Sequence, residues 1–87
     1  MKIKKELFLR NVAGENMLIP VGETTGEYNG IFVLDGIGET IWKMIENGME
    51  QNEIVSALLS EYDAPEADIK ADVEAFIGKL RDLGIVE

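Results

Sequence analysis

The chain contains neither cysteine nor histidine among its 87 residues. It therefore has no thiol nucleophile, no disulfide, no cysteine-based zinc site, and no histidine that acts as a general base or haem ligand. Carboxylates are plentiful, but the D-x-D-x-D-G spacing of a calcium-binding loop is missing. These absences close most, though not all, routes to an enzyme.

Basic side chains are also scarce. Eight Lys and Arg stand against 17 Asp and Glu, so the formal net charge is −9 and the pI about 4.4. Affinity for nucleic acid depends on basic side chains, and anionic membranes repel an acidic surface in the same way. We therefore expect neither as a partner. The charge fits a cationic or neutral peptide or protein partner, and it is equally explained by solubility alone.

Long apolar stretches are missing as well. No run approaches the roughly 20 residues of a membrane-spanning helix, and residues 1–10 lack the apolar segment and cleavage site of a signal peptide. We expect a cytoplasmic protein. Its length predicts one domain over residues 1–87, with a small core and marginal stability.

Short apolar stretches in the first 34 residues predict three β-strands. The first covers residues 6–12 and the second residues 17–21, and a turn at residues 13–16 joins them into a hairpin. Residues 22–30 are polar and contain three glycines, which predicts a loop. Residues 31–34 (IFVL) form the third strand.

Apolar residues at steps of three and four predict three helices, over residues 37–47, 50–62 and 65–84. Asp35 is placed to cap the first helix. Glu50 is placed to cap the second, where Met49 and Ile54 occupy the two positions of a hydrophobic staple. The third begins with a proline, a residue favoured at the first helical position.

The order βββααα predicts an α+β fold, a three-stranded antiparallel sheet covered by three helices in a winged-helix-like arrangement. So small a sheet has edges that expose unpaired N–H and C=O groups. An extended peptide can add to such an edge as another strand. The third strand either offers this edge or pairs internally on both sides, and the sequence leaves both readings open.

The third helix carries two lines of side chains at about 100° per residue. Its apolar side, most of which must be core, comprises Ile69, Val73, Phe76, Ile77, Leu80 and Leu83. The roughly opposite side carries the small residues Ala67, Ala71, Ala75 and Gly78. Good helix formers on a solvent face explain this second line best, and the alternative is that a partner segment approaches it.

The order and spacing of three segments resemble the PqqD-like family, the recognition elements for precursors of ribosomally synthesised and modified peptides. The strongest segment is residues 33–42 (VLDGIGETIW), in which an apolar pair and Asp35 are followed by a small residue and then Ile-Trp. Residues 48–58 resemble the second helix of the family, and residues 72–85 its third helix and stop. The resemblance covers the chain from about residue 7 to residue 86.

The resemblance implies a winged-helix arrangement without catalysis or cofactor. It implies that the leader region of a precursor peptide adds as a β-strand beside the third strand, in a groove against the third helix. The domain then presents the peptide to a modifying enzyme, often a radical S-adenosylmethionine enzyme. Carried over to this chain, the peptide-binding residues are Gly30, Ile31, Phe32, Val33, Leu34, Asp35, Ile69, Lys70, Val73, Phe76 and Ile77. Lys70 is assigned to an acidic leader group, and which apolar residues face groove or core stays open.

Three other hypotheses fit less well. A winged-helix DNA-binding regulator is the main alternative, but residues 50–62 contain no Lys or Arg. An acyl carrier protein would need a serine where Gly36 stands. A small enzyme built on Asp35 and Glu39 lacks a third group, and a helix-capping Asp35 with a solvated Glu39 is the simpler interpretation.

Overall fold

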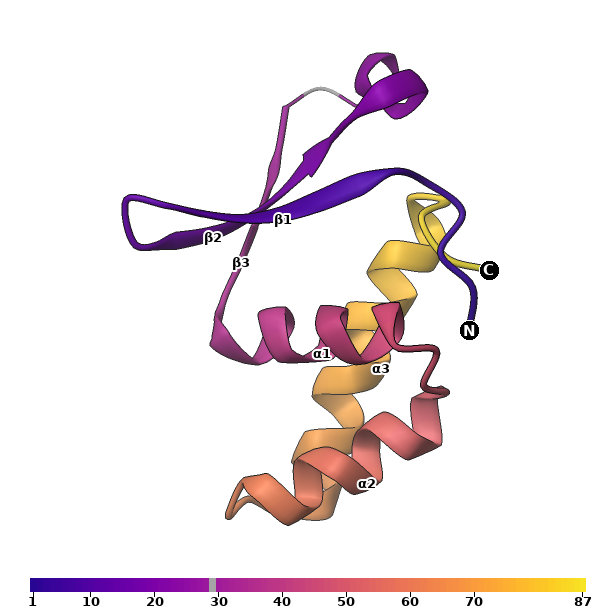
Figure 1. Cartoon of the computed structure of the whole chain (residues 1–87). Coiled ribbons are helices and arrows are strands. Elements are labelled where there is room, and N and C mark those ends of the chain that lie inside the picture. Colours follow the sequence, from indigo (N-terminus) through magenta and orange to yellow (C-terminus); the bar gives the residue numbers. More distant parts are fainter. Residues whose placement is uncertain (29) are drawn as a thin grey trace.

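The computed structural model describes residues 1–28 and 30–87, and within them three β-strands precede three α-helices (Figure 1). The strands are β1 Leu7–Val12, β2 Glu15–Pro20 and β3 Phe32–Leu34, and the helices are α1 Gly36–Glu46, α2 Gln51–Glu61 and α3 Glu66–Asp82. The predicted α+β order is therefore confirmed. The stretch predicted as a loop contains a 3-10 helix, η1 Gly22–Gly26, and its Asn29 lies outside the described residues.

The predicted hairpin of β1 and β2 has a tighter turn than residues 13–16. Val12 pairs with Glu15, so only Ala13 and Gly14 form the loop. Their φ angles are 53° and 83°, and positive φ at both central residues characterises the I′ turn, whose twist matches that of the strands. Because polar residues are common in turns and at strand ends alike, the sequence pattern did not assign Glu15 to β2.

The sheet is antiparallel with β2 in the centre, in the order β1-β2-β3. The β2–β3 ladder ends at the pair Leu18↔Phe32. Continuing this register would set Pro20 opposite Gly30, and proline has no N–H to donate to a ladder. Ile31, predicted as the first strand residue, therefore lies just outside β3.

Side-chain hydrogen bonds cap the N-termini of the first two helices. The Asp35 carboxylate accepts a hydrogen bond of 2.7 Å from the Gly38 N–H and caps α1. At the start of α2, the Glu53 carboxylate accepts a 2.9 Å hydrogen bond from the N–H of the cap residue Glu50. Pro65 was predicted to be the first residue of α3 but is its N-cap residue, with a ψ of 140°. The helix therefore begins one residue later than predicted.

One cluster of buried apolar side chains joins the sheet to the helices. Its members are Leu7, Leu18, Ile41, Trp42, Ile45, Ile54, Val55, Leu58, Ile69, Val73, Ile77, Leu80, Ile85 and Val86. The last two follow α3, where Val86 forms a β-bridge with Ile3 and the Ile85 carbonyl accepts a 2.7 Å hydrogen bond from the Lys4 N–H. This packing fixes the C-terminal end of α3 beneath the sheet.

The connection between β2 and β3 is held against the start of β1. The buried Thr24 accepts a 3.0 Å hydrogen bond from the Glu6 N–H through its hydroxyl oxygen. The Glu27 carboxylate accepts a 2.8 Å hydrogen bond from Lys5, and this bond raises the pKa of Lys5. These contacts guide the chain back so that β3 enters beside β2.

None of the helices in the described residues combines the length and apolar composition needed to cross a lipid bilayer.

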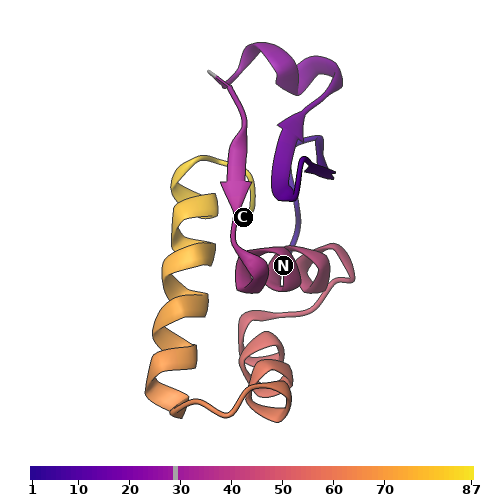
Figure 2. The same ribbon diagram turned by 90° about the vertical axis from the view of Figure 1, so that its left-hand side faces the viewer.

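Figure 2 shows the position of β3 relative to its neighbours, on which the site depends. There β3 runs between β2 on one side and the C-terminal half of α3 on the other.

Candidate functional site

Strand β3 forms an edge of the sheet. It pairs with β2, and no other strand of residues 1–28 and 30–87 pairs with its opposite side. Of the two readings that the sequence left open, the structure therefore supports the open edge. Such an edge presents backbone donors and acceptors to an incoming strand.

The ladder register identifies which backbone groups point outward. A two-residue hairpin closes with a hydrogen-bonded pair, here Val12↔Glu15, and hydrogen-bonded pairs then alternate with non-bonded ones. On β2, the groups of Leu18 consequently point toward β3, where they meet those of Phe32. One residue further, the N–H and C=O of Val33 point away from β2, and those of Ile31 share this direction.

A groove of about 360 Å³ lies between the outward edge of β3 and helix α3. The residues that line it are Leu18, Ile31, Phe32, Val33, Leu34, Asp35, Phe76, Lys79, Leu80 and Leu83. Eight of these ten are aliphatic or aromatic, and the two charged residues, Asp35 and Lys79, lie at one end. The groove can therefore hold apolar side chains next to free backbone groups.

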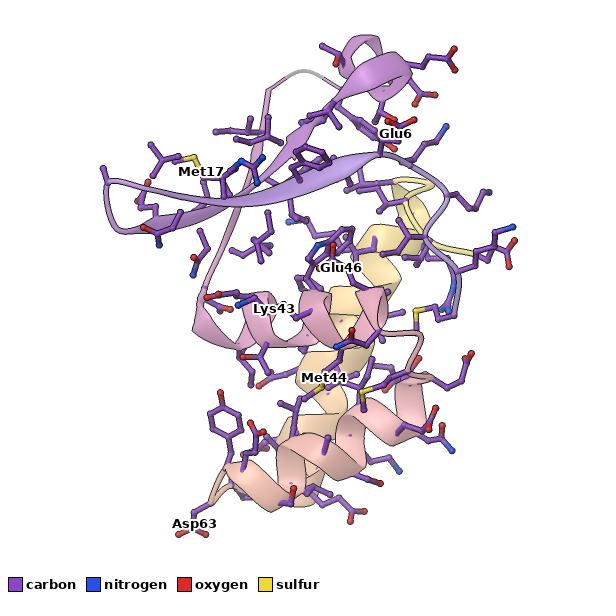
Figure 3. All side chains as sticks on the ribbon, viewed as in Figure 1. Glu6, Met17, Lys43, Met44, Glu46 and Asp63 are labelled. Atoms are coloured by element: carbon purple, nitrogen blue, oxygen red, sulfur yellow. The ribbon has the colours of Figure 1, made fainter. Side chains whose placement is uncertain are left out.

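The two faces of β3 differ in exposure. Phe32 and Leu34 are half-buried on the side of the helices, whereas Val33 is 60% exposed. Met17, the partner of Val33 on β2, also points away from the helices (Figure 3). A strand added to β3 would likewise send alternate side chains toward the groove and toward the outer face.

The position of Phe76 in the groove depends on a glycine of α1, Gly38, which has no side chain to displace the ring. A Cβ on Gly38 would lie 3.3 Å from the Phe76 ring and 3.0 Å from an Asp35 carboxylate oxygen. Both distances are tighter than ordinary contact. The absent side chain thus lets α1 approach both the ring and its own cap.

Tyr28 joins the two walls at the end of the groove where β3 begins. Its hydroxyl donates a 2.7 Å hydrogen bond to the carbonyl of Leu83, the C-cap of α3. Its ring stands edge-on to Phe32, with 5.6 Å between centroids and 74° between planes. This pairing sets the separation of strand and helix at that end.

The charged end of the groove lies where β3 passes into α1. Asp35 is engaged there as the cap of α1. Glu39, expected to be solvated, is instead half-buried and accepts a 2.6 Å hydrogen bond from the Asn16 side chain. It also pairs with Lys43 at 2.8 Å. This expectation was wrong because β2, which is remote in sequence, supplies a partner.

The structure brings part of the predicted site together. Residues 31–35 and Phe76 line the groove, and Gly30 precedes them with a left-handed φ of 100°. Ile69, Val73 and Ile77 are at most 3% exposed and belong to the core instead. None of these three residues is among those that line the groove.

Lys70 lies in a different place. It lines a cleft of about 700 Å³ between α2 and α3, together with Glu66 and Glu74. This cleft is larger than the groove, but it offers no open strand edge. Within the described residues, no group of three or more acidic side chains is arranged to hold a metal ion.

Three groove residues of α3 were not among the predicted site residues: Lys79, Leu80 and Leu83. The two leucines stand on the apolar side that the helical period identifies, so a signal existed for them. The period does not tell which turns of that side face the strand. These residues line the groove because β3 lies beside the C-terminal half of α3 (Figure 2).

Comparison with known proteins identifies the family. Residues 16–86 match the family described as coenzyme PQQ synthesis protein D (PqqD). Since the match covers most of the chain, the protein belongs to the PqqD family, and the resemblance stated from the sequence is confirmed. None of the curated proteins compared is significantly similar to the chain.

A solved structure with the same fold is that of TbiB1 in complex with the TbiA(beta) leader peptide. The two chains superpose with a TM-score of 0.77 and are 26% identical. The superposition covers 100% of this chain and 95% of TbiB1.

Proposed function

We propose that the protein is a non-catalytic adaptor that binds the leader region of a ribosomally synthesised precursor peptide by β-strand addition. The single observation that carries the proposal is the open edge of β3 facing an apolar groove. Membership of the PqqD family supports it. So does the likeness to TbiB1, which was solved with a leader peptide.

The register predicts how the peptide would lie. A peptide residue opposite Val33 would exchange both backbone hydrogen bonds with it, and Ile31 would offer a second pair of groups. The peptide neighbours opposite Phe32 and Leu34 would then send their side chains into the groove. The leader is therefore expected to carry apolar side chains at positions i and i+2.

The magnitudes fit a reversible complex. Four backbone hydrogen bonds contribute about 1 kcal/mol each, and two buried apolar anchors contribute about 1.5–3 kcal/mol each. Ordering the peptide offsets part of this sum. The remainder is compatible with a dissociation constant near 1 μM, or about 8 kcal/mol, which allows the modified product to leave.

The partner enzyme is part of the proposal. We infer that the bound leader is presented to a peptide-modifying enzyme, with a radical S-adenosylmethionine enzyme as the specific candidate. Because the domain adds no catalytic group of its own to this scheme, its contribution is to raise the local concentration of the substrate. The cytoplasmic location stays a prediction from the sequence.

The test is a titration of the isotopically labelled protein with leader peptides encoded by precursor genes that neighbour its own. Binding should shift the backbone amides of Ile31 and Val33 and of residues 76–83. Calorimetry of the same mixtures should give a dissociation constant within about tenfold of 1 μM. Shifts concentrated on α2 and the hairpin turn, with β3 unchanged, would contradict strand addition.

A further inference from the structure

The groove has a tied end and an open end. At the start of β3, Tyr28 bridges strand and helix through its contacts with Phe32 and the Leu83 carbonyl. At the other end, where β3 passes into α1, a second hollow of about 320 Å³ lies between α1 and α3. The two hollows share Asp35 and Lys79 as lining residues.

Phe76 also lines both hollows, so they form one continuous surface rather than two separate sites. Beyond it, the second hollow has apolar walls from Ile37 on α1 and Ala75 on α3, and Asp72 lies along the same helix. Ala75 belongs to the line of small residues on α3.

Lys79 is the one cation among the lining residues of the joined hollows in the described part of the chain. The ion pairs of this part involve the amino terminus, Lys5 and Lys43, and Lys79 is in none of them. One oxygen of the nearby Asp35 carboxylate accepts a hydrogen bond from the Gly38 N–H, and no ion pair joins Asp35 to Lys79 in the described residues. An exposed ammonium group at the junction is therefore left for a ligand.

We propose that the bound peptide continues past Asp35 into the hollow between α1 and α3, and that one of its carboxylate side chains pairs with Lys79 at the junction. This inference rests on the proposed function and specifies its substrate. The peptide then has a defined order of side chains. Two apolar anchors lie against β3, an acidic residue lies at Lys79, and an aliphatic residue lies on Ile37 and Ala75.

The charges around the hollow make this order selective. Asp72 lies nearly two helical turns before Lys79 on α3, so it faces the part of the peptide beyond the acidic residue. A second peptide carboxylate there would meet a like charge. The net charge of −9 opposes acidic peptides in general, and only a local cation can reverse this preference at short range.

The experiment begins with selection from a display library of random 15-residue peptides on the intact protein. Because the added strand is antiparallel to β3, the enriched sequences should contain Asp or Glu followed by two apolar residues two positions apart. The strongest peptide is then synthesised, and its affinity is measured by calorimetry for the wild type, Lys79→Glu and Lys70→Glu. Both variants change the net charge equally, but Lys70 lies outside the joined hollows.

Lys79→Glu should weaken binding by about tenfold or more, as expected for loss of a charge-assisted contact and gain of repulsion. Lys70→Glu should change the affinity by about twofold at most, as for a remote surface charge. A peptide in which the acidic residue is replaced by Lys should recover affinity for Lys79→Glu and lose it for the wild type. This exchange is a readout that a structural effect of the substitution would not produce.

Two failures can be told apart. Equal losses for the two lysine variants, or enriched peptides without an acidic residue, would overturn the extension while leaving strand addition intact. Absence of any enriched peptide would contradict strand addition and the extension together. Circular dichroism of each variant confirms that the fold is unchanged before affinities are compared.

Discussion

At the scale of single residues, a few side chains with sharply defined surroundings shape the groove. Gly38 leaves the space into which Phe76 fits, and Tyr28 joins the strand wall to the helix wall. Asp35 caps α1 at the point where the open edge ends. Together these contacts hold the groove in shape.

Phe76 provides a test at this scale. Replacement by alanine removes an aromatic wall of the groove, so the affinity for the leader peptide should fall by about tenfold to a hundredfold. Calorimetry measures this change. Phe8→Ala is the matched control, because Phe8 is 50% exposed on the opposite face of the sheet. Its affinity should stay within about twofold of the wild type, and equal losses in both variants would remove the groove from the explanation.

At the scale of elements, strand β3 and helix α3 act as a pair. The strand offers backbone groups on its free edge, and the C-terminal half of the helix offers apolar side chains across from them. The N-terminal half of the same helix instead packs its apolar residues into the core, where Ile69 and Val73 are buried. The helix thus contributes to the core along its length and lines the groove with its C-terminal half.

A proline in the free edge tests the strand. In Val33→Pro the lost N–H is one that points away from β2, so the sheet should persist while the affinity falls by about tenfold or more. The residue before it, Phe32, is already extended, as proline requires. Titration followed by amide shifts measures both fold and binding.

The same substitution at the other edge of the sheet is the control for this variant. The register turns the N–H of Asn11 on β1 away from β2 as well, so Asn11→Pro removes an equivalent donor from the edge without the groove. It should bind the peptide as the wild type does. Undiminished binding by Val33→Pro would show that the peptide does not use β3.

At the scale of the whole molecule, the protein combines a single core with an excess of negative charge. The sheet, the helices and the C-terminal residues meet in a single buried cluster. Around it, 17 acidic residues face only eight basic ones. Such an imbalance favours solubility and destabilises the compact state through self-repulsion.

Salt should therefore stabilise the fold. Raising sodium chloride from 0.1 to 1 M shortens the screening length from about 10 to about 3 Å, and the melting temperature should rise by about 2–5 °C. The fluorescence of Trp42, the single tryptophan, which is buried in the core, follows unfolding. A variant with Glu23, Glu61 and Glu74 changed to glutamine should respond less. A melting temperature that falls with salt would contradict this account.

The sequence by itself determined the features that depend on local interactions. Alternation and helical spacing predicted the order of the elements, and the caps at Asp35 and Glu50 follow from residues three positions away. The resemblance to the PqqD family needed only the motif and its spacing. In each case the interacting groups are close together along the chain, so their pattern contains the information.

Only the tertiary structure decided which turns of α3 face the open edge of β3. The sequence left the β3 edge open to either reading and expected Glu39 in solvent. The family resemblance gave Ile69, Val73, Phe76 and Ile77 as groove candidates, with Lys70 for an acidic leader group, and left open which of the apolar residues face the core. The folded chain sets β3 against later turns of α3, where Lys79, Leu80 and Leu83 stand, and it brings Asn16 to Glu39. Helical periodicity defines the angle of a side chain around its helix. The height at which another element crosses that helix depends on packing between segments far apart in the sequence.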